Sequence, residues 1–203
     1  MKTVTVSPSD DLIKLLKTAK EKVGTKELAK MSGFKTKSLY HWWSGRRTIP
    51  FKLLKASCDI LNKNIWNEIN GHYLLVQGGI KGHTILFHSE LTPEISNLLG
   101  WIVTDGHLSG KNEITITQKY ESVLKILGNK IRDIFEYKGA LTVQKHKSQL
   151  GVGNKIWINS SALQFILSQF YGIPIGNKTR IVEVPKQILE SDNSEIKKSF
   201  LCA

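Results

Sequence analysis

The 203-residue sequence lacks several features on which many protein classes depend. It has two cysteines, Cys58 and Cys202, and no C-x-x-C pair, so it offers no disulfide framework and no multi-cysteine zinc site. No segment approaches the roughly 20 apolar residues of a membrane-spanning helix, and no signal peptide is visible. The six histidines show no H-E-x-x-H spacing, and neither a P-loop nor a dinucleotide-binding glycine pattern occurs. These absences favour a reduced, cytoplasmic setting.

Acidic residues are also scarce, which leaves a formal net charge of +12 and a pI of about 9.7. Residues 1–90 carry 15 basic and 7 acidic side chains, and residues 91–203 carry 14 and 10, so both halves are basic. Lysine and arginine displace condensed counterions from phosphates, which makes nucleic acid the expected partner. A membrane is a weaker expectation because long apolar segments are absent. The hydrophobic content of 40% suffices for one or two packed domains.

The N-terminal third predicts a bundle of short helices. Ser7-Pro8-Ser9 opens the first helix, which ends at Gly24. Two short helices, Lys26 to Met31 and about Thr36 to Trp43, flank a Ser-Gly turn, and the second turns Leu39 and Trp42 inward. Pro50 begins a further helix. Two short helices joined by a glycine turn are typical of a helix-turn-helix.

Residues 10–62 resemble the repressor/Cro type of helix-turn-helix. The framework positions that match are Leu28, Ala29, Gly33, Leu39, Trp42 and Gly45. The resemblance implies that the second helix enters the major groove of DNA. Base contacts are then expected from Thr36, Lys37, Tyr40 and His41, and phosphate contacts from Lys35, Arg46 and Arg47.

The match departs from that family at two positions. Lys35 stands where a capping Ser or Thr is common, so the cap is expected to shift to Thr36. Trp43 stands where an acid is usual, and an exposed Trp there could pack on a neighbouring domain. The alternative interpretation is a helical bundle used for protein contacts.

Residues 98–106, Leu-Leu-Gly-Trp-Ile-Val-Thr-Asp-Gly, predict a buried helix that begins after Thr92-Pro93 and stops at Gly106. Asp105 lies at the helix C-terminus, where cations are favoured over anions. A bound divalent metal is one reason for an acid there. A core helix that simply ends in an Asp-Gly turn is the other. Gly100 and Thr104 share one face, which would let another helix approach closely.

This stretch resembles, without a gap, the LAGLIDADG motif of homing endonucleases. The identical positions are Leu98, Gly100, Ile102, Asp105 and Gly106. The resemblance implies that two such helices pack together, and that Asp105 and the Thr104 carbonyl bind the Mg²⁺ used to cleave DNA. It also implies a homodimer through the Leu98–Thr104 helix. Gln118 lies at the end of a predicted strand, where members of that family often carry a polar residue near the metal, so the resemblance implies that Gln118 is a second catalytic residue.

Residues 91–172 predict the order α-β-β-α-β-β-α, which matches one LAGLIDADG domain. In that fold the four strands form a curved saddle on DNA. Period-two alternation places one set toward the helices, namely Ile114, Ile116, Leu141, Val143, Ile156 and Ile158. The saddle set is Thr115, Thr117, Lys119, Gln144, His146, Lys155 and Trp157. For any one of these residues, an ordinary solvent-facing position is the alternative.

The predicted fold class is α+β, with an all-α helix-turn-helix bundle (1–66), a linker or hairpin (67–90) and a LAGLIDADG-type domain (91–203). Residues 199–203 resemble the opening of a second motif, cut short before its acid. The function predicted is Mg²⁺-dependent double-strand DNA cleavage by a homing-endonuclease-like hydrolase. The alternatives are a non-cleaving DNA-binding transcriptional regulator, a truncated endonuclease remnant, or a protein-interaction module.

Overall fold

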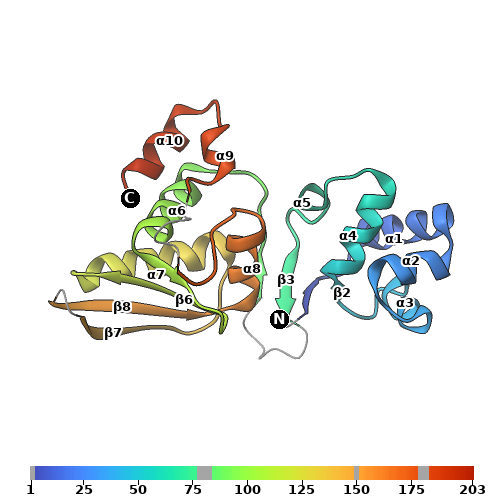
Figure 1. The fold of residues 1–203 in the computed structure, drawn as a ribbon, viewed down its shortest axis with the longest axis horizontal. Coiled ribbons are helices and arrows are strands. Elements are labelled where there is room, and N and C mark those ends of the chain that lie inside the picture. The colour runs from blue at the N-terminus through green and yellow to red at the C-terminus, as the bar shows by residue number, and fades with distance from the viewer. Residues whose placement is uncertain (1–2, 77–83, 149–150, 178–182) are drawn as a thin grey trace. The chain divides into compact units, whose positions relative to one another are not determined.

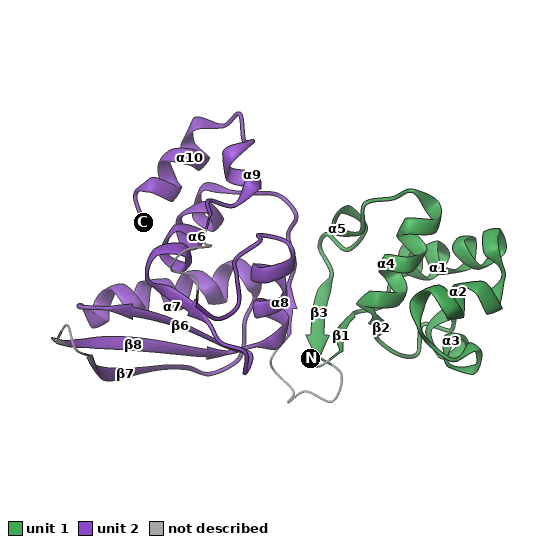
Figure 2. Cartoon of the chain, in the orientation of Figure 1, with its two compact units in different colours: residues 1–79 green, residues 80–203 purple. Residues whose placement is uncertain are grey.

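Helices dominate the first part of the chain, and helices alternate with an antiparallel sheet in the second (Figure 1). The computed structural model describes residues 3–76, 84–148, 151–177 and 183–203. The chain divides into two units, residues 1–79 and residues 80–203 (Figure 2). The unit boundary falls within the segment expected as a linker or hairpin (67–90), of which residues 77–83 lie outside the described residues.

Unit 1 is built on five helices within its described residues. They are α1 (Asp10–Val23), α2 (Thr25–Ser32), α3 (Thr36–Trp43), α4 (Phe51–Leu61) and α5 (Ile65–Glu68). Helix α1 begins directly after the predicted opening segment 7–9, and Ser9 caps it: its Oγ accepts a hydrogen bond from the Leu12 N–H at 3.3 Å. The apolar faces of α1, α2, α3 and α4 meet in one core that fully buries Leu16, Leu28 and Leu39.

The prediction that the N-terminal region is all helical is wrong. Strand β1 (Val4–Val6) pairs antiparallel with β2 (Ile49–Pro50) on one side and with β3 (Tyr73–Val76) on the other. Such short strands lack the alternation over four to eight residues that reveals a strand in sequence. Residues 73–76 therefore belong to the sheet of unit 1.

Unit 2 contains the predicted α-β-β-α-β-β-α order. Its elements are β4 (Ile85–Leu86), α6 (Pro93–Asp105), β5 (Gly106–Leu108), β6 (Glu113–Gln118), α7 (Glu121–Phe135), β7 (Leu141–Ser148), β8 (Gly151–Asn159), α8 (Ser161–Gln169), α9 (Lys186–Leu189) and α10 (Ser194–Leu201). The sheet is antiparallel with the strand order β5-β6-β8-β7. Thr92 caps α6 as predicted, accepting a hydrogen bond from the Ile95 N–H at 3.3 Å.

The two faces of the unit 2 sheet separate as the alternation predicts. Ile114, Ile116, Ile156 and Ile158 are buried beneath the helices, while Leu141 and Val143 on the edge strand are half-buried. Figure 1 shows α6, α7 and α8 on this same side of the sheet. The opposite face of the sheet is left to polar side chains.

Helix α10 packs along α6 and fills the small-residue face that had been expected to meet a second copy. Ser96 Oγ donates to the Ile196 carbonyl at 2.7 Å, and Asn97 Nδ2 donates to the Ser199 carbonyl at 3.0 Å. The residue numbers rise together along both helices, so α6 and α10 run parallel. A Cβ added at Gly100 would lie 2.5 Å from the Phe200 carbonyl oxygen, so only glycine permits this approach. A homodimer through this face would first have to displace α10.

Gly106 ends α6 for a reason that differs from the predicted one. Its φ is −86° and its backbone is extended, so it is not a left-handed C-terminal glycine but the first residue of β5. A Cβ at this position would lie 2.6 Å from the carbonyl oxygen of Ile102. The glycine is therefore required by the close approach of β5 to the last turn of α6.

The α+β class is thus confirmed, with two antiparallel sheets. The finer assignment, a Cro-type helix-turn-helix followed by a LAGLIDADG domain, stays a prediction.

Candidate nucleic-acid interface

Helices α2 and α3 are joined by a three-residue turn, Gly33-Phe34-Lys35. Gly33 has φ 71°, and its N–H donates to the carbonyls of the last turn of α2. The Phe34 N–H donates to the Ala29 carbonyl at 3.0 Å, which closes the helix end. Helix α3 begins at Thr36, so the expected shift of the cap to Thr36 is wrong: Lys35 is the N-cap and gives no side-chain cap.

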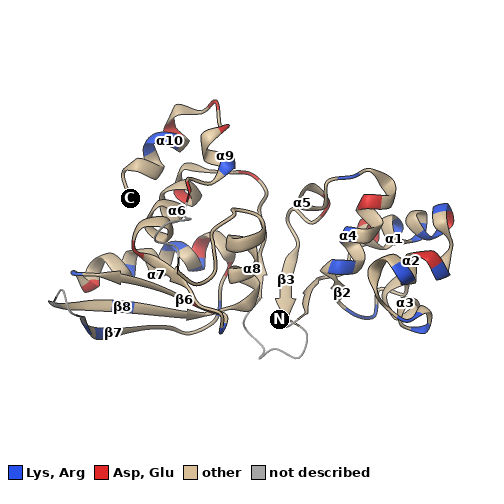
Figure 3. Ribbon diagram, viewed as in Figure 1, with Lys and Arg blue, Asp and Glu red and all other residues tan. Residues whose placement is uncertain are grey.

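All seven side chains predicted to contact DNA lie on α3 or beside its ends, and we call this set the α3 surface. Its members are Lys35, Thr36, Lys37, Tyr40, His41, Arg46 and Arg47. Thr36 is half-buried and the other six are exposed, with Tyr40 60% accessible. Figure 3 shows basic residues on α3 and on the segment that follows it. None of these cations is in an ion pair among the described residues, so their charge is available to an anionic partner.

The inward face of α3 differs by one position from the prediction. The buried pair is Leu39 and Trp43, four residues apart, whereas Trp42 is half-buried with its ring 4.8 Å from that of Phe34. Trp43 is 9% accessible and packs within unit 1 instead of on a neighbouring domain. Tyr40 stands edge-on to it, with ring centroids 5.2 Å apart. This contact holds the exposed Tyr40 ring at a fixed place on the α3 surface.

Sequence reasoning missed Lys52, which lies in the first turn of α4. Its Nζ would lie 2.7 Å from a Cβ added at Gly33, so the ammonium group sits over the turn between α2 and α3. Lys52 is exposed and adds a cation beside Gly33. Lys52 lies 19 positions after Gly33 in the sequence, and no local pattern reveals their proximity.

The predicted catalytic pair is brought together in unit 2. Gln118 Nε2, at the end of β6, donates to Asp105 Oδ2 at 2.5 Å. Both Asp105 and Thr104 are exposed, and Thr104 Oγ1 donates to the Gly100 carbonyl at 3.0 Å. The amide hydrogen occupies one carboxylate oxygen, which orients the Asp105 side chain at the end of α6.

The donor set for Mg²⁺ at this position consists of one carboxylate. No group of three or more His, Cys, Asp or Glu side chains that could hold a metal occurs within residues 3–76, 84–148, 151–177 and 183–203. Magnesium commonly keeps several waters and uses one or two carboxylates together with substrate phosphates. Asp105 alone therefore supplies the smallest number of carboxylates with which proteins bind Mg²⁺. Binding of Mg²⁺ by Asp105 and Thr104 stays a prediction.

The uncovered side of the unit 2 sheet presents a second polar surface, which we call the open sheet face. Its members are His107, Thr115, Thr117, Thr142, Gln144, His146, Lys155 and Trp157. The register places His107, Thr115, Trp157 and Thr142 in one row across all four strands. Trp157 is half-buried, and Lys155 Nζ lies 5.5 Å from the centroid of its ring.

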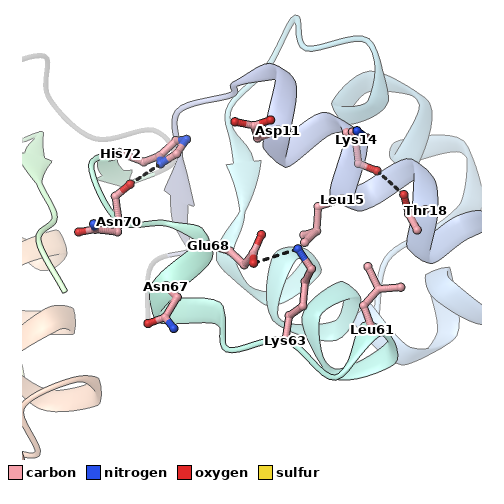
Figure 4. A pocket seen from close by; sticks show the side chains of 10 residues that line it. All are labelled: Asp11, Lys14, Leu15, Thr18, Leu61, Lys63, Asn67, Glu68, Asn70 and His72. Atoms are coloured by element: carbon pink, nitrogen blue, oxygen red, sulfur yellow. Dashed lines mark hydrogen bonds and ion pairs between the residues drawn. The ribbon is translucent and has the colours of Figure 1, made fainter. Parts of the chain in front are cut away.

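A cleft of about 620 Å³ lies in unit 1 between α1, the end of α4 and α5 (Figure 4). Its walls mix opposite charges that are partly paired: Lys63 Nζ lies 3.0 Å from Glu68 Oε1. His72 Nδ1 lies 3.0 Å from the Asn70 carbonyl oxygen, so its polar edge is already engaged within the protein. Because these polar groups already bond to one another, the lining of the cleft does not indicate one class of ligand.

The buried Cys58 supplies no nucleophile to these surfaces. Burial, with added repulsion from the carboxylates of Glu68 and Asp59, raises the pKa of the Cys58 thiol to about 12. Cys202 is exposed and free. A thiol that stays protonated is a poor nucleophile. None of the described helices is both long and apolar enough to cross a membrane.

A comparison with known proteins finds a partial match. The chain is 32% identical over 160 residues, 73% of its length, to the replication factor C small subunit of Methanocaldococcus jannaschii. The matched segment is 8% of that protein, so the chain spans only a small part of the relative's length. No family model matches the chain.

This match overturns the predicted endonuclease function. The relative is named as a subunit of a replication factor, and not as a nuclease or hydrolase. The prediction of Mg²⁺-dependent double-strand cleavage, and the assignment of the chain as a homing endonuclease, are therefore wrong. The same finding overturns the alternatives of a transcriptional regulator and an endonuclease remnant. The error arose because a nine-residue helix motif describes how two helices pack, and packing alone does not establish chemistry.

Proposed function

We propose that this chain binds double-stranded DNA through unit 1, with α3 in the major groove as in a helix-turn-helix. The observation that carries the proposal is the α3 surface: six exposed side chains, four of them Lys or Arg, on and beside one eight-residue helix. Lys52 adds a fifth cation over the turn. A replication-factor relative supports a DNA-associated role at this coarse level.

The roles within the surface follow from reach and charge. Lys37 and His41 are four residues apart on one face of α3, so both can address base edges along the groove. Tyr40 lies beside them on the ring of Trp43. Arg46 and Arg47, after the helix, suit the phosphates that flank a groove, because such contacts fix position without reading sequence.

The test is binding of the full chain to a labelled 20-base-pair duplex, measured by fluorescence anisotropy across a salt series. We expect Lys37→Ala with Arg46→Ala to weaken binding and to flatten the slope of log affinity against log salt. Each lost phosphate contact should change that slope by about 0.9. The control is Lys14→Ala, which removes one exposed cation from the polar cleft and should leave the slope nearly unchanged (Figure 4).

Three results would contradict the proposal. Salt-independent affinity would mean that phosphates are not the partner. An equal loss in Lys14→Ala would mean that net charge alone, and not the α3 surface, attracts DNA. Absence of duplex binding at low salt would favour the interpretation of unit 1 as a protein-contact bundle.

A further inference from the structure

Strand β7 forms one edge of the unit 2 sheet, and no strand of the described residues pairs with its outer side. Its inner side pairs with β8 along the whole strand, from Leu141↔Ile158 to Ser148↔Gly151. In an antiparallel ladder, every second residue turns its backbone N–H and C=O away from the partner strand. The outer side of β7 therefore offers a row of backbone donors and acceptors on which a further strand can form.

A groove of about 370 Å³ runs between this edge strand and helix α7. Its floor is apolar and consists of Leu124 from α7, Leu141 and Val143 from β7, and Ile156 from β8. The two β7 residues stay half-buried, since no strand among the described residues lies beyond them. Gly128 lines the same groove, and a Cβ there would lie 3.1 Å from Leu141 Cδ1 and 3.2 Å from Ile156 Cδ1. The floor thus lacks the apolar side chains that a neighbouring strand would lay over it.

The rim of this groove is basic. Its cations are exposed and come from both elements: Lys125 and Arg132 from α7, and Lys145 and Lys147 from β7. The two β7 lysines continue the side of the strand that carries Leu141 and Val143, because alternate residues share a face. The three cations other than Lys125 are in no ion pair within residues 3–76, 84–148, 151–177 and 183–203.

Two acids lie at the ends of α7 and offset part of this charge. Glu121 Oε1 lies 2.8 Å from Lys125 Nζ. This hydrogen bond is the main reason why the pKa of Glu121 is lowered, and the charge of Lys145 adds to the effect. Glu136 is the C-cap of α7. With four cations against two acids, the rim keeps an excess of positive charge.

The two halves of β7 favour different neighbours in an added strand, because side chains directly opposite each other across two strands interact. Leu141 and Val143 favour apolar partners, and Lys145 and Lys147 favour acidic ones. A second copy of β7 does not meet these needs. Paired parallel, it would set lysine opposite lysine; paired antiparallel about residue 144, it would set the lysines over the apolar floor. A nucleic acid would leave both the floor and the backbone groups of β7 without partners.

We propose that the groove between β7 and α7 binds an extended acidic peptide of a partner protein, which adds to the sheet as a strand antiparallel to β7. Alternate side chains of the peptide face the groove: two acidic ones opposite Lys147 and Lys145, followed by two apolar ones opposite Val143 and Leu141. In strand addition the main-chain hydrogen bonds give affinity, and pockets for alternate side chains give specificity. The site lies in unit 2 and shares no residue with the α3 surface, so this proposal and duplex binding by unit 1 can fail separately.

The first experiment measures the fluorescence anisotropy of a labelled peptide that contains Glu-Thr-Glu-Thr-Val-Thr-Val, titrated with the full chain. This order matches the side chains of β7 read in the antiparallel direction, and valine and threonine favour the strand conformation. The comparison is a scrambled peptide of the same composition. We expect the ordered peptide to bind more tightly by about tenfold, because only the ordered peptide places all four groups on one face. Equal affinities would overturn the proposal.

The protein variants test the basic rim. Lys145→Glu and Arg132→Glu each place a like charge against the acidic peptide, and each should weaken its binding by about fivefold or more. Both residues are exposed and lie outside the apolar floor, so the fold should persist. The matched control is Lys111→Glu, an exposed lysine in the turn between β5 and β6 at the opposite edge of the sheet. An equal loss in Lys111→Glu would mean that net charge alone attracts the peptide, which would overturn the proposal.

Two changes in the peptide test the groove and the strand edge without altering the protein. Replacing both valines by serine should weaken binding by about tenfold, because the apolar floor then stays uncovered. Methylation of backbone nitrogens removes donors from the peptide. Since alternate residues of a strand direct their N–H groups to opposite sides, methylation of one alternate set should abolish binding and methylation of the other should be tolerated. The same loss for both sets would contradict strand addition.

A competition experiment separates a peptide site from a site for nucleic acid. It uses the chain with Lys37→Ala and Arg46→Ala, in which duplex binding by unit 1 is expected to be weakened. An excess of the 20-base-pair duplex should leave the peptide bound, because phosphates gain nothing from an apolar floor. Displacement of the peptide by duplex in this variant would assign the basic rim to nucleic acid and overturn the proposal.

Discussion

The two polar surfaces of the chain are built on different physical grounds. The α3 surface presents exposed cations on a short helix over a fully buried Leu39. The open sheet face presents one tryptophan among threonines, with one lysine at its side. The first surface suits a partner with regularly spaced phosphates, whereas the second carries little charge of its own.

This comparison shows that the net charge of each half does not predict which surface carries the positive charge. Both halves of the sequence are basic, yet the basic residues of unit 2 lie mainly away from the open sheet face. The five predictions below test whether the two units and their surfaces are as separate as this difference implies, and they run from the largest expected effect to the smallest.

Thiol labelling should separate the units most sharply. With its pKa raised to about 12, Cys58 in unit 1 has a thiolate fraction at pH 8 that is lower than that of an ordinary exposed cysteine by roughly 10³-fold or more. We expect Cys202 to react rapidly with a maleimide or disulfide reagent and Cys58 to react only as unit 1 opens, as judged by mass spectrometry of digested protein.

The same thiol predicts a pH effect on unit 1. The folded state keeps the Cys58 proton up to about pH 12, while the unfolded thiol releases its proton near the reference value of 9.0. The free energy of unfolding should therefore fall as pH rises between these values. Cys58→Ser provides the comparison, and rapid labelling of native Cys58 would show that unit 1 is not closed as described.

Salt should sharpen the contrast between the surfaces. If the four Lys and Arg side chains of the α3 surface and Lys52 each displace counterions, raising salt from about 50 to 200 mM should weaken duplex binding by roughly 10²-fold or more. Anisotropy titrations across the salt series measure this loss, and an affinity that does not change with salt would contradict the assignment of the α3 surface to DNA.

Gly100→Ala should destabilise unit 2 alone. The added methyl group meets the Phe200 carbonyl oxygen, and crowding of this kind typically costs about 1–3 kcal/mol. The matched control is Gly110→Ala, where no atom lies within 4 Å of the new Cβ. Thermal unfolding followed by circular dichroism should show a lower transition for Gly100→Ala only; identical curves would mean that α10 does not rest on α6.

Loss of one helix cap should give the smallest effect, in the unit that holds it. Ser9→Ala removes the cap of α1 and the 2.9 Å contact of Ser9 Oγ with His72 Nε2, and should cost about 1 kcal/mol in unit 1. Ser160→Ala removes the cap of α8 and should cost a similar amount in unit 2. Amide hydrogen exchange resolves each unit, and a loss of protection shared by both units would show that they unfold together.

Sequence patterns were most reliable where period and caps coincide. Thr92 and Pro93 located the start of α6, and the alternation of Ile114 and Ile116 against Thr115 and Thr117 assigned both faces of β6. These features are local, so neighbouring residues are enough to identify them.

The failures were nonlocal. Strand β1 is only three residues long and exists because Ile49 and Leu74, far along the chain, pair beside it. The burial of Trp43 instead of Trp42 depends on contacts such as Lys20 Nζ, 4.8 Å from the Trp43 ring centroid. The prediction of function failed for a different reason. Gly100 and Gly106 belong to a motif in which glycine is needed for close packing. That need is the same whether or not Asp105 takes part in chemistry.

The pairing of α6 with α10 also sets the order in which the chain can fold. The hydrogen bond from Ser96 to Ile196 joins residues 100 positions apart, and that from Asn97 to Ser199 joins residues 102 apart. During synthesis, α6 and the sheet of unit 2 emerge long before their last helix does. The face around Gly100 must remain uncovered for that interval, while unit 1 already has every residue it requires. We therefore expect nascent unit 2 to be more exposed to misassembly than unit 1.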